Sequence, residues 1–271
     1  MLLLNILKSI IYTTSYVLTK FIIFICIILL YKENLHAEDI KNFNNFKSHK
    51  AVYNLRINNV SSSSKVHSAF GQMNLEVYKS CEGWVINQDS LIDITDKHGT
   101  QYRNEFRYSI WESFNGNFFR FLSQVIINGE EIAYYEGKAY KKDKDAKVIY
   151  IRPNKKEINI PLETLFPMKH FMATLMLKDK NFKSYTVFTG ENEESLTHVN
   201  SFLKEVEMEG QLYKKIRTAV FELNSVSSEP VHEIELIIDN YGIARSVVFD
   251  YLDYKIIGKL NKYKFVSNEK C

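Results

Sequence analysis

The stretch from Ala69 to Trp84 most constrains the fold, because it alternates between two kinds of residue and then turns at a cysteine. Every second residue from 69 to 77 is apolar or small, and most of the residues between them are polar. This is the period of a half-buried β-strand. Ser80-Cys81-Glu82-Gly83 interrupts the alternation as a turn, and Trp84 begins a second strand. The pattern therefore predicts a hairpin with Cys81 at its turn.

The same alternation recurs in segments along most of the chain. Turn signals separate these segments; one is Asn128-Gly129, a pair that favours a tight hairpin. The chain holds 17 Tyr and 18 Phe but only 10 Gly and 4 Pro, a composition that suits half-buried strands. The charged run at 141–145 is predicted to be a solvated hairpin tip, with an interaction patch as the alternative. Strands are predicted at 48–60, before 77, 84–95, 102–110, 118–127, 132–140, 148–151, 157–160, 185–188, 196–203, 213–223, 231–239, 243–251 and 254–265.

We predict an all-β fold, a single antiparallel barrel or strongly coiled sheet of about 12–14 strands, because so many strands do not stay flat and open. One helix interrupts the strand patterns at 167–178, where Pro167 stands at a plausible first helical position. Apolar residues follow at helical spacing. The favoured interpretation is a helix that plugs the open end of the curved sheet; the alternative is contact with a lipid or peptide, since methionine adapts to irregular shapes. The stripe consists of Met168, Phe171, Met172, Leu175 and Met176.

The first 37 residues are predicted to be a signal peptide rather than part of the fold. Lys8 and Lys20 precede or flank an apolar run at 21–31, which has the length of a signal-peptide core and is short for a membrane span. Leu35-His36-Ala37 is an acceptable cleavage site. The alternative is a retained membrane anchor. Either way we expect residues 38–271 to form one exported domain.

Export changes what the cysteines imply, since two cysteines in an oxidising compartment usually form one disulfide. Outside the N-terminal segment the chain has Cys81 and, as its last residue, Cys271. A redox-active pair is the alternative, but the close spacing or electropositive setting that such pairs need is not visible. We therefore predict a structural disulfide between Cys81 and Cys271.

No motif for catalysis, metal binding or nucleic-acid binding stands out. Without residues 1–37 the chain has 32 basic and 31 acidic side chains, a balance that offers no general attraction to nucleic acid. The histidines are scattered without metal-ligand spacing, and no nucleophile elbow, phosphate loop or dinucleotide fingerprint is present. His170 is the best single candidate for a functional side chain, although a core histidine is the favoured interpretation. We predict a protein that is not an enzyme and that has no metal and no cofactor.

Several short stretches form an ordered set along the chain. They are Cys81-Glu82-Gly83-Trp84, Asn87-Gln88, Trp111-Glu112-Ser113 with Gly116, Gly137-Lys138-Ala139, Leu162-Glu163-Thr164-Leu165-Phe166-Pro167 with His170, Phe188-Thr189-Gly190, Asn240-Tyr241-Gly242, Asp250-Tyr251 and Cys271. This set resembles the cell-envelope integrity EipB family, periplasmic proteins of Gram-negative bacteria, and the resemblance covers about residues 48–271. It implies a spiral-like, incompletely closed β-barrel with a helix, a disulfide between Cys81 and Cys271, a role in envelope integrity, and a periplasmic partner of the tetratricopeptide-repeat type.

Two functions follow as hypotheses. The first is a non-enzymatic periplasmic scaffold that supports envelope integrity by binding a repeat protein. The second is a carrier or sensor of a lipid or other apolar envelope molecule, held in a cavity of the coiled sheet; a hydrolase of peptidoglycan or lipid is a minor third. The residues predicted to line such a cavity or a partner surface are Trp84, Trp111, Phe119, Phe121, Phe166, His170 and Met172, and the alternative is that the aromatic ones fill a dry core.

Overall fold

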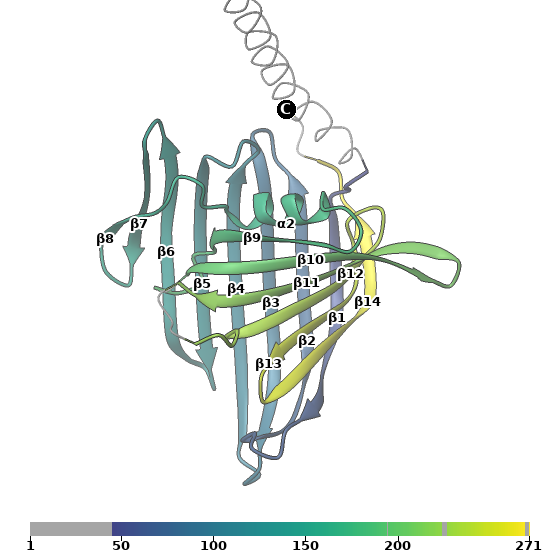
Figure 1. Cartoon of the computed structure of the whole chain (residues 1–271). Helices are drawn as coiled ribbons and strands as arrows, with labels where there is room; N and C mark the ends of the chain where they lie inside the picture. Colours follow the sequence, from purple (N-terminus) through teal and green to yellow (C-terminus); the bar gives the residue numbers. More distant parts are fainter. Residues whose placement is uncertain (1–44, 194, 224–226, 269–270) are drawn as a thin grey trace, which may run out of the picture. The chain divides into compact units, whose positions relative to one another are not determined.

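One sheet dominates the computed structural model of the chain (Figure 1). The model describes residues 45–193, 195–223, 227–268 and 271, so the predicted signal peptide lies outside the described residues. Each strand is antiparallel to its neighbours. The described strands are β1 (His49–Val60), β2 (Val66–Lys79), β3 (Gly83–Asp96), β4 (Gln101–Ser113), β5 (Phe118–Ile127), β6 (Glu130–Lys142), β7 (Asp145–Arg152), β8 (Lys156–Asn159), β9 (Asn181–Phe188), β10 (Leu196–Met208), β11 (Gln211–Glu222), β12 (His232–Ile238), β13 (Ala244–Tyr251) and β14 (Tyr254–Phe265).

The strand order explains how the two ends of the domain meet. It runs from β8 back to β1, continues into β14 and then runs back to β9, so the first and last strands pair in the middle of the sheet. The two edges are therefore β8 and β9, which are consecutive in the chain. No pairing in the described ranges joins these edges, and the sheet is not closed. Fourteen twisted strands coil until the two halves face each other, as predicted.

Strands β9–β12 cross in front of the strands of the first half of the sheet (Figure 1). The buried apolar side chains form three clusters. One buried cluster joins β4–β7 to Phe166 and Phe188. A second joins β1 and β2 to β13 and β14, with Tyr53 among its members. A third lies around Trp84 and Met168. Inward positions alternate with outward ones along each strand, because successive side chains in a strand point to opposite faces.

The segment between the two edge strands carries α2 (Pro167–Leu175), the only helix in the described part of the chain. Just before the helix, Leu165 makes a parallel bridge to Val187 of β9, so this segment pairs with one edge of the sheet. The predicted helix is confirmed but ends at Leu175 rather than at 178, because Leu177 bonds back to Thr174 in a tighter turn. No helix within the described ranges is long and apolar enough to cross a membrane.

Two predicted hairpins are confirmed. Asn128 and Gly129 have φ angles of 53° and 86°, which is the left-handed pair that a tight primed turn requires. The charged run at 141–145 forms the tip between β6 and β7, with Asp143 also in the left-handed region. Residues 142–145 are exposed, as expected of a solvated tip, and the alternative of an interaction patch stays a prediction.

The C-terminal tail is hydrogen-bonded to the residue that precedes β1. Val266 N–H donates to the carbonyl of Ser48, whose hydroxyl donates to Asn268 Oδ1 over 2.6 Å. The same hydroxyl accepts the N–H of Lys79, two residues before Cys81. Cys81 and Cys271 consequently lie at disulfide-bonding distance, with Cα atoms 5.5 Å apart and a sequence separation of 190. This is the separation that disulfides usually span.

Candidate functional site

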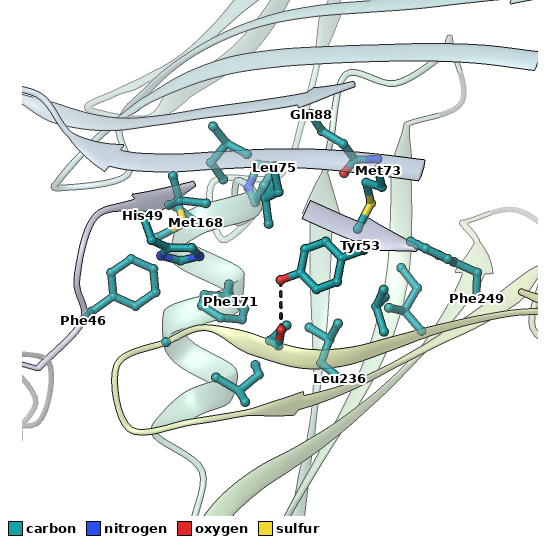
Figure 2. A pocket seen from close by; sticks show the side chains of 18 residues that line it. Phe46, His49, Tyr53, Met73, Leu75, Gln88, Met168, Phe171, Leu236 and Phe249 are labelled. Atoms are coloured by element: carbon teal, nitrogen blue, oxygen red, sulfur yellow. Dashed lines mark hydrogen bonds between the residues drawn. The ribbon is translucent and has the colours of Figure 1, made fainter. Parts of the chain in front are cut away.

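A half-open apolar cavity of about 240 Å³ lies inside the coiled sheet, beneath the first turn of α2 (Figure 2). Eighteen residues of β1–β3, α2, β12, β13 and the adjoining loops line it, and only His49, Tyr53 and Gln88 among them carry polar side-chain atoms. On one side Met73 and Leu75 come from β2, and opposite them Leu236 and Phe249 come from β12 and β13 (Figure 2). The sequence builds this wall by alternation, because inward positions of neighbouring strands converge on one face.

The three polar groups of the cavity differ in how they are satisfied. The hydroxyl of Tyr53 donates to the carbonyl of Ala244 over 3.0 Å (Figure 2), and burial raises the pKa of this phenol to above its usual range. Gln88 is half-buried and its amide nitrogen donates to Ser90 Oγ over 3.3 Å. His49 is 1 % exposed, its Nδ1 lies 2.8 Å from the carbonyl oxygen of Lys47, and burial lowers the pKa of its imidazole. The neutral ring is therefore the resident form at neutral pH.

Helix α2 is held over the cavity by a buried carboxylate from β4. Pro167 occupies the first helical position, and the next two N–H groups, of Met168 and Lys169, donate to the two oxygens of Glu112 over 2.7 and 2.9 Å. Free N–H groups at a helix start favour an anionic partner. Burial nevertheless raises the pKa of Glu112 to about 7, against the opposing effect of these bonds and of the Lys141 and Lys169 ammonium groups.

His170 points away from the cavity, towards β10. Its Nε2 lies 2.9 Å from Ser201 Oγ and 3.4 Å from Thr174 Oγ1, and burial lowers its pKa to about 4. A serine beside a histidine resembles a nucleophile and its base, but Ser201 is fully buried and offers no approach to a substrate. The pair works as a polar contact that fixes α2 against β10.

The seven residues predicted for a cavity or partner surface are distributed over four places. None of them lines the apolar cavity beneath α2, and Trp111 lines a separate pocket together with Glu82 and Arg120. Trp84 and Met172 pack in the cluster behind the cavity wall, where Trp84 meets Phe46 edge-on at 5.1 Å. His170 lies against β10. As candidates for a partner surface, the seven remain a prediction.

The aromatic run on β5 divides between two faces, which corrects the predicted lining. Phe119 and Phe121 point inward and pack with Phe166, which stacks on Phe119 at 4.9 Å, so these three fill dry core. Phe118 points outward with Trp111, whose Nε1–H donates to Ser80 Oγ over 3.1 Å. For Phe119, Phe121 and Phe166 the alternative prediction of a dry core therefore holds, and alternation along the strand explains why Phe118 lies on the other face.

No group of three or more histidine, cysteine, aspartate or glutamate side chains is arranged to hold a metal ion within the described ranges. Near the cavity, the Tyr53 hydroxyl and the Glu112 carboxylate are bonded to other segments of the protein. The arrangement can hold an apolar group of modest size. At about 30 Å³ per water-sized position, the cavity has room for about eight heavy atoms.

Comparison with known proteins agrees with this architecture. A family model described as EipB-like matches residues 41–267. The cell envelope integrity protein EipB of Brucella abortus (strain 2308) is 23 % identical over 240 residues, which are 82 % of this chain and 85 % of that protein. A crystal structure of a beta-barrel-like protein from Brucella abortus, assigned to a domain of unknown function, superimposes with a TM-score of 0.73 and 20 % identity and covers 82 % of this chain and 99 % of that one. The chain therefore belongs to the EipB-like family.

Proposed function

We propose that this protein supports the integrity of the cell envelope from the periplasm, as a non-enzymatic binding protein. The envelope role is supported by the name of the Brucella relative, and the periplasmic location by the sequence of residues 1–37. Binding rather than catalysis is supported by the site itself, in which the buried polar groups hold segments of the protein together. The half-open apolar cavity beneath α2 carries the proposal, and its ligand is an apolar molecule of the envelope.

Filling the cavity tests this function. Leu236 lies on the cavity wall beside Tyr53 (Figure 2), so Leu236→Trp places an indole where the ligand would lie. The matched control is Leu91→Trp on β3, where the leucine side chain is 41 % exposed and outside the cavity. In a strain that lacks the protein, we expect the wild type and Leu91→Trp to restore growth in detergent, and Leu236→Trp to fail.

Native mass spectrometry supplies the second readout. The wild-type protein taken from the periplasm should carry an additional, constant mass that is lost on denaturation, and the folded Leu236→Trp variant should not. Full restoration of growth by a folded Leu236→Trp protein would remove the cavity from the function. A bare wild-type mass would favour the second candidate.

The second candidate is a scaffold that binds a periplasmic protein of the repeat type, and an exposed aromatic pair on the edge of the sheet favours it. Phe182 of β9 and Phe202 of β10 are direct cross-strand partners, with 68 % and 37 % of their surfaces exposed. Clustered exposed apolar side chains at a sheet edge are typical of interaction sites. A groove of about 450 Å³, lined by Tyr185 and Ala173 among others, runs between this edge and α2.

Cross-linking in the periplasm followed by capture tests the scaffold. The double variant Phe182→Ser with Phe202→Ser should lose a repeat protein that the wild type retains. Phe70→Ser on β2, where the ring is 59 % exposed, is the control and should retain it. Capture of the same protein by all three forms would place the interaction elsewhere.

A further inference from the structure

His49 lines the cavity, and one of its two ring nitrogens has no hydrogen-bond partner among the described residues. Its Nδ1 lies 2.8 Å from the carbonyl oxygen of Lys47, and a carbonyl can only accept, so Nδ1 carries the proton and donates it. In the neutral ring this assignment leaves Nε2 unprotonated, as an acceptor. No described group forms a hydrogen bond with Nε2, although the side chain is 1 % exposed.

The surroundings of His49 are apolar. The ring stands in the wall of the cavity together with Phe46, Met168 and Phe171 (Figure 2), and the centroid of the Phe46 ring lies 6.0 Å away. A buried acceptor without a partner costs free energy, and natural structures satisfy the great majority of such groups. The cavity beside it is the place from which a partner can come.

We propose that the cavity binds a neutral apolar molecule of about eight heavy atoms, or the end of a longer one, that carries a hydroxyl group and donates its proton to Nε2 of His49. This inference rests on the proposed ligand-binding function of the cavity and names the chemical class of the ligand. The hydroxyl satisfies the histidine, and the hydrocarbon part replaces water along the apolar wall.

Two other classes of ligand, an ionised carboxylate and a molecule that can only accept hydrogen bonds, fit this cavity less well than a neutral alcohol. An ionised carboxylate is costly to bury unless a cation meets it, and the cavity wall provides none. Burial lowers the pKa of His49, although the bond to Lys47 and the charge of Asp239 act in the opposite direction, so the imidazole does not supply that cation at neutral pH. Asp239 is itself paired with Arg245 at 2.7 Å. A ligand that is only an acceptor would meet the Nε2 lone pair with a lone pair of its own.

The other two polar residues of the wall already use one donor each. The Tyr53 proton is donated to the Ala244 carbonyl, so this hydroxyl fixes β1 to β13 and can only accept a further bond. Gln88 is half-buried on β3, and its amide nitrogen donates to Ser90. The Tyr53 and Gln88 side-chain oxygens keep acceptor lone pairs, but the imidazole nitrogen of His49 is the most basic of the three acceptors, and the variants below assign the contact to it.

Two isomers separate the hydroxyl contact from simple apolar binding. Heptan-1-ol and 1-methoxyhexane have the same formula and the same eight heavy atoms, but only the alcohol can donate a proton. In a cavity without an acceptor the ether should bind better, because the alcohol loses hydrogen bonds to water on entry. With the His49 acceptor we expect the alcohol to bind about fivefold more tightly, measured by titration calorimetry on the full exported protein.

Variants then assign the preference to one side chain. His49→Leu removes the acceptor and should reverse the preference in favour of the ether. His198→Leu changes an exposed histidine on β10, outside the cavity, and should leave the preference unchanged. If His49→Leu fails to fold, the wild-type comparison still tests whether the cavity accepts the proton of a hydroxyl group. Equal binding of the two isomers, or tighter binding of the ether, overturns the hydroxyl contact alone, whereas binding of neither overturns the ligand-binding function of the cavity as well.

Discussion

Replacing Glu112 by glutamine tests which of two effects on its ionisation is larger, the cost of burying the charge or the stabilisation of the charge by the start of α2. The carboxylate is 1 % exposed and accepts the N–H groups of Met168 and Lys169, so two effects act on it in opposite directions. Burial penalises its charge, whereas the bonds and the helix dipole favour the charge. Because the pKa is raised to about 7, burial outweighs the rest.

The raised pKa sets the direction and the size of the effect. The folded protein binds the Glu112 proton more tightly than the unfolded chain does, so the stability from this group is fully present below pH 4.5 and is lost as pH rises through 7. An increase from 4.5 to about 7 corresponds to about 3 kcal/mol of unfolding free energy. Glutamine has nearly the same shape and does not titrate, but it keeps one acceptor oxygen, so one of the two helix N–H groups loses its partner. The Glu112→Gln variant should therefore be less stable than the wild type near pH 4.5 and should gain about 3 kcal/mol relative to it between pH 4.5 and pH 8.

Urea unfolding at a series of pH values, with the cysteine pair oxidised, measures this difference. Taking the difference between the two proteins is essential, since the lowered pKa values of His49, His170 and His232 make stability rise with pH between about 4 and 6.5 in both. A wild-type advantage that grows as pH rises would refute the reasoning, because it would show that the helix start outweighs the cost of burying the charge.

Two further predictions concern the covalent closure and the aromatic core. Replacing either Cys81 or Cys271 by serine should lower the unfolding free energy by the same amount, at most about 5 kcal/mol for a closed loop of 190 residues. The double variant should be no less stable than either single variant. Unequal losses in non-reducing thermal melts would show that the two cysteines are not partners. Phe166→Ala should cost about 3–5 kcal/mol in urea unfolding, because its fully buried ring stacks in the cluster of β4–β7, whereas Phe182→Ala, at a ring that is 68 % exposed, should cost less than about 0.5 kcal/mol. Similar losses for the two phenylalanines would contradict the assignment of core and surface.

Much of the fold could be predicted because its signals are local. Alternation marks a strand wherever one face is buried, and Asn128-Gly129 specifies a turn by its own backbone preferences. Pro167 and the apolar stripe that follows it likewise locate the helix. The first and last residues of strands were less well predicted. Strand β9 begins at Asn181, four residues before the predicted 185, because its early residues are exposed and lack the alternating pattern.

The cavity could not be predicted in the same way, since its lining depends on which strands face each other across the coil. Alternation assigns a residue to a face but does not say what lies opposite. The inward orientation of His49 could have been predicted, because this residue stands two positions before Ala51 on the face that continues through Tyr53. Glu112 likewise stands on the face of Tyr108 and Ile110, but only the fold shows that α2 begins above it.

One turn of helix connects the buried carboxylate to the cavity. The N–H of Met168 is bonded to Glu112, while the side chain of the same residue stands in the cavity wall near His49. Any shift of α2 that lengthens the bond to Glu112 must therefore change the shape of the cavity as well. A ligand that requires the docked position of α2 must stabilise that position by mass action, in proportion to its affinity. The buried carboxylate and the ligand thus act on the same element, although they lie on different sides of it.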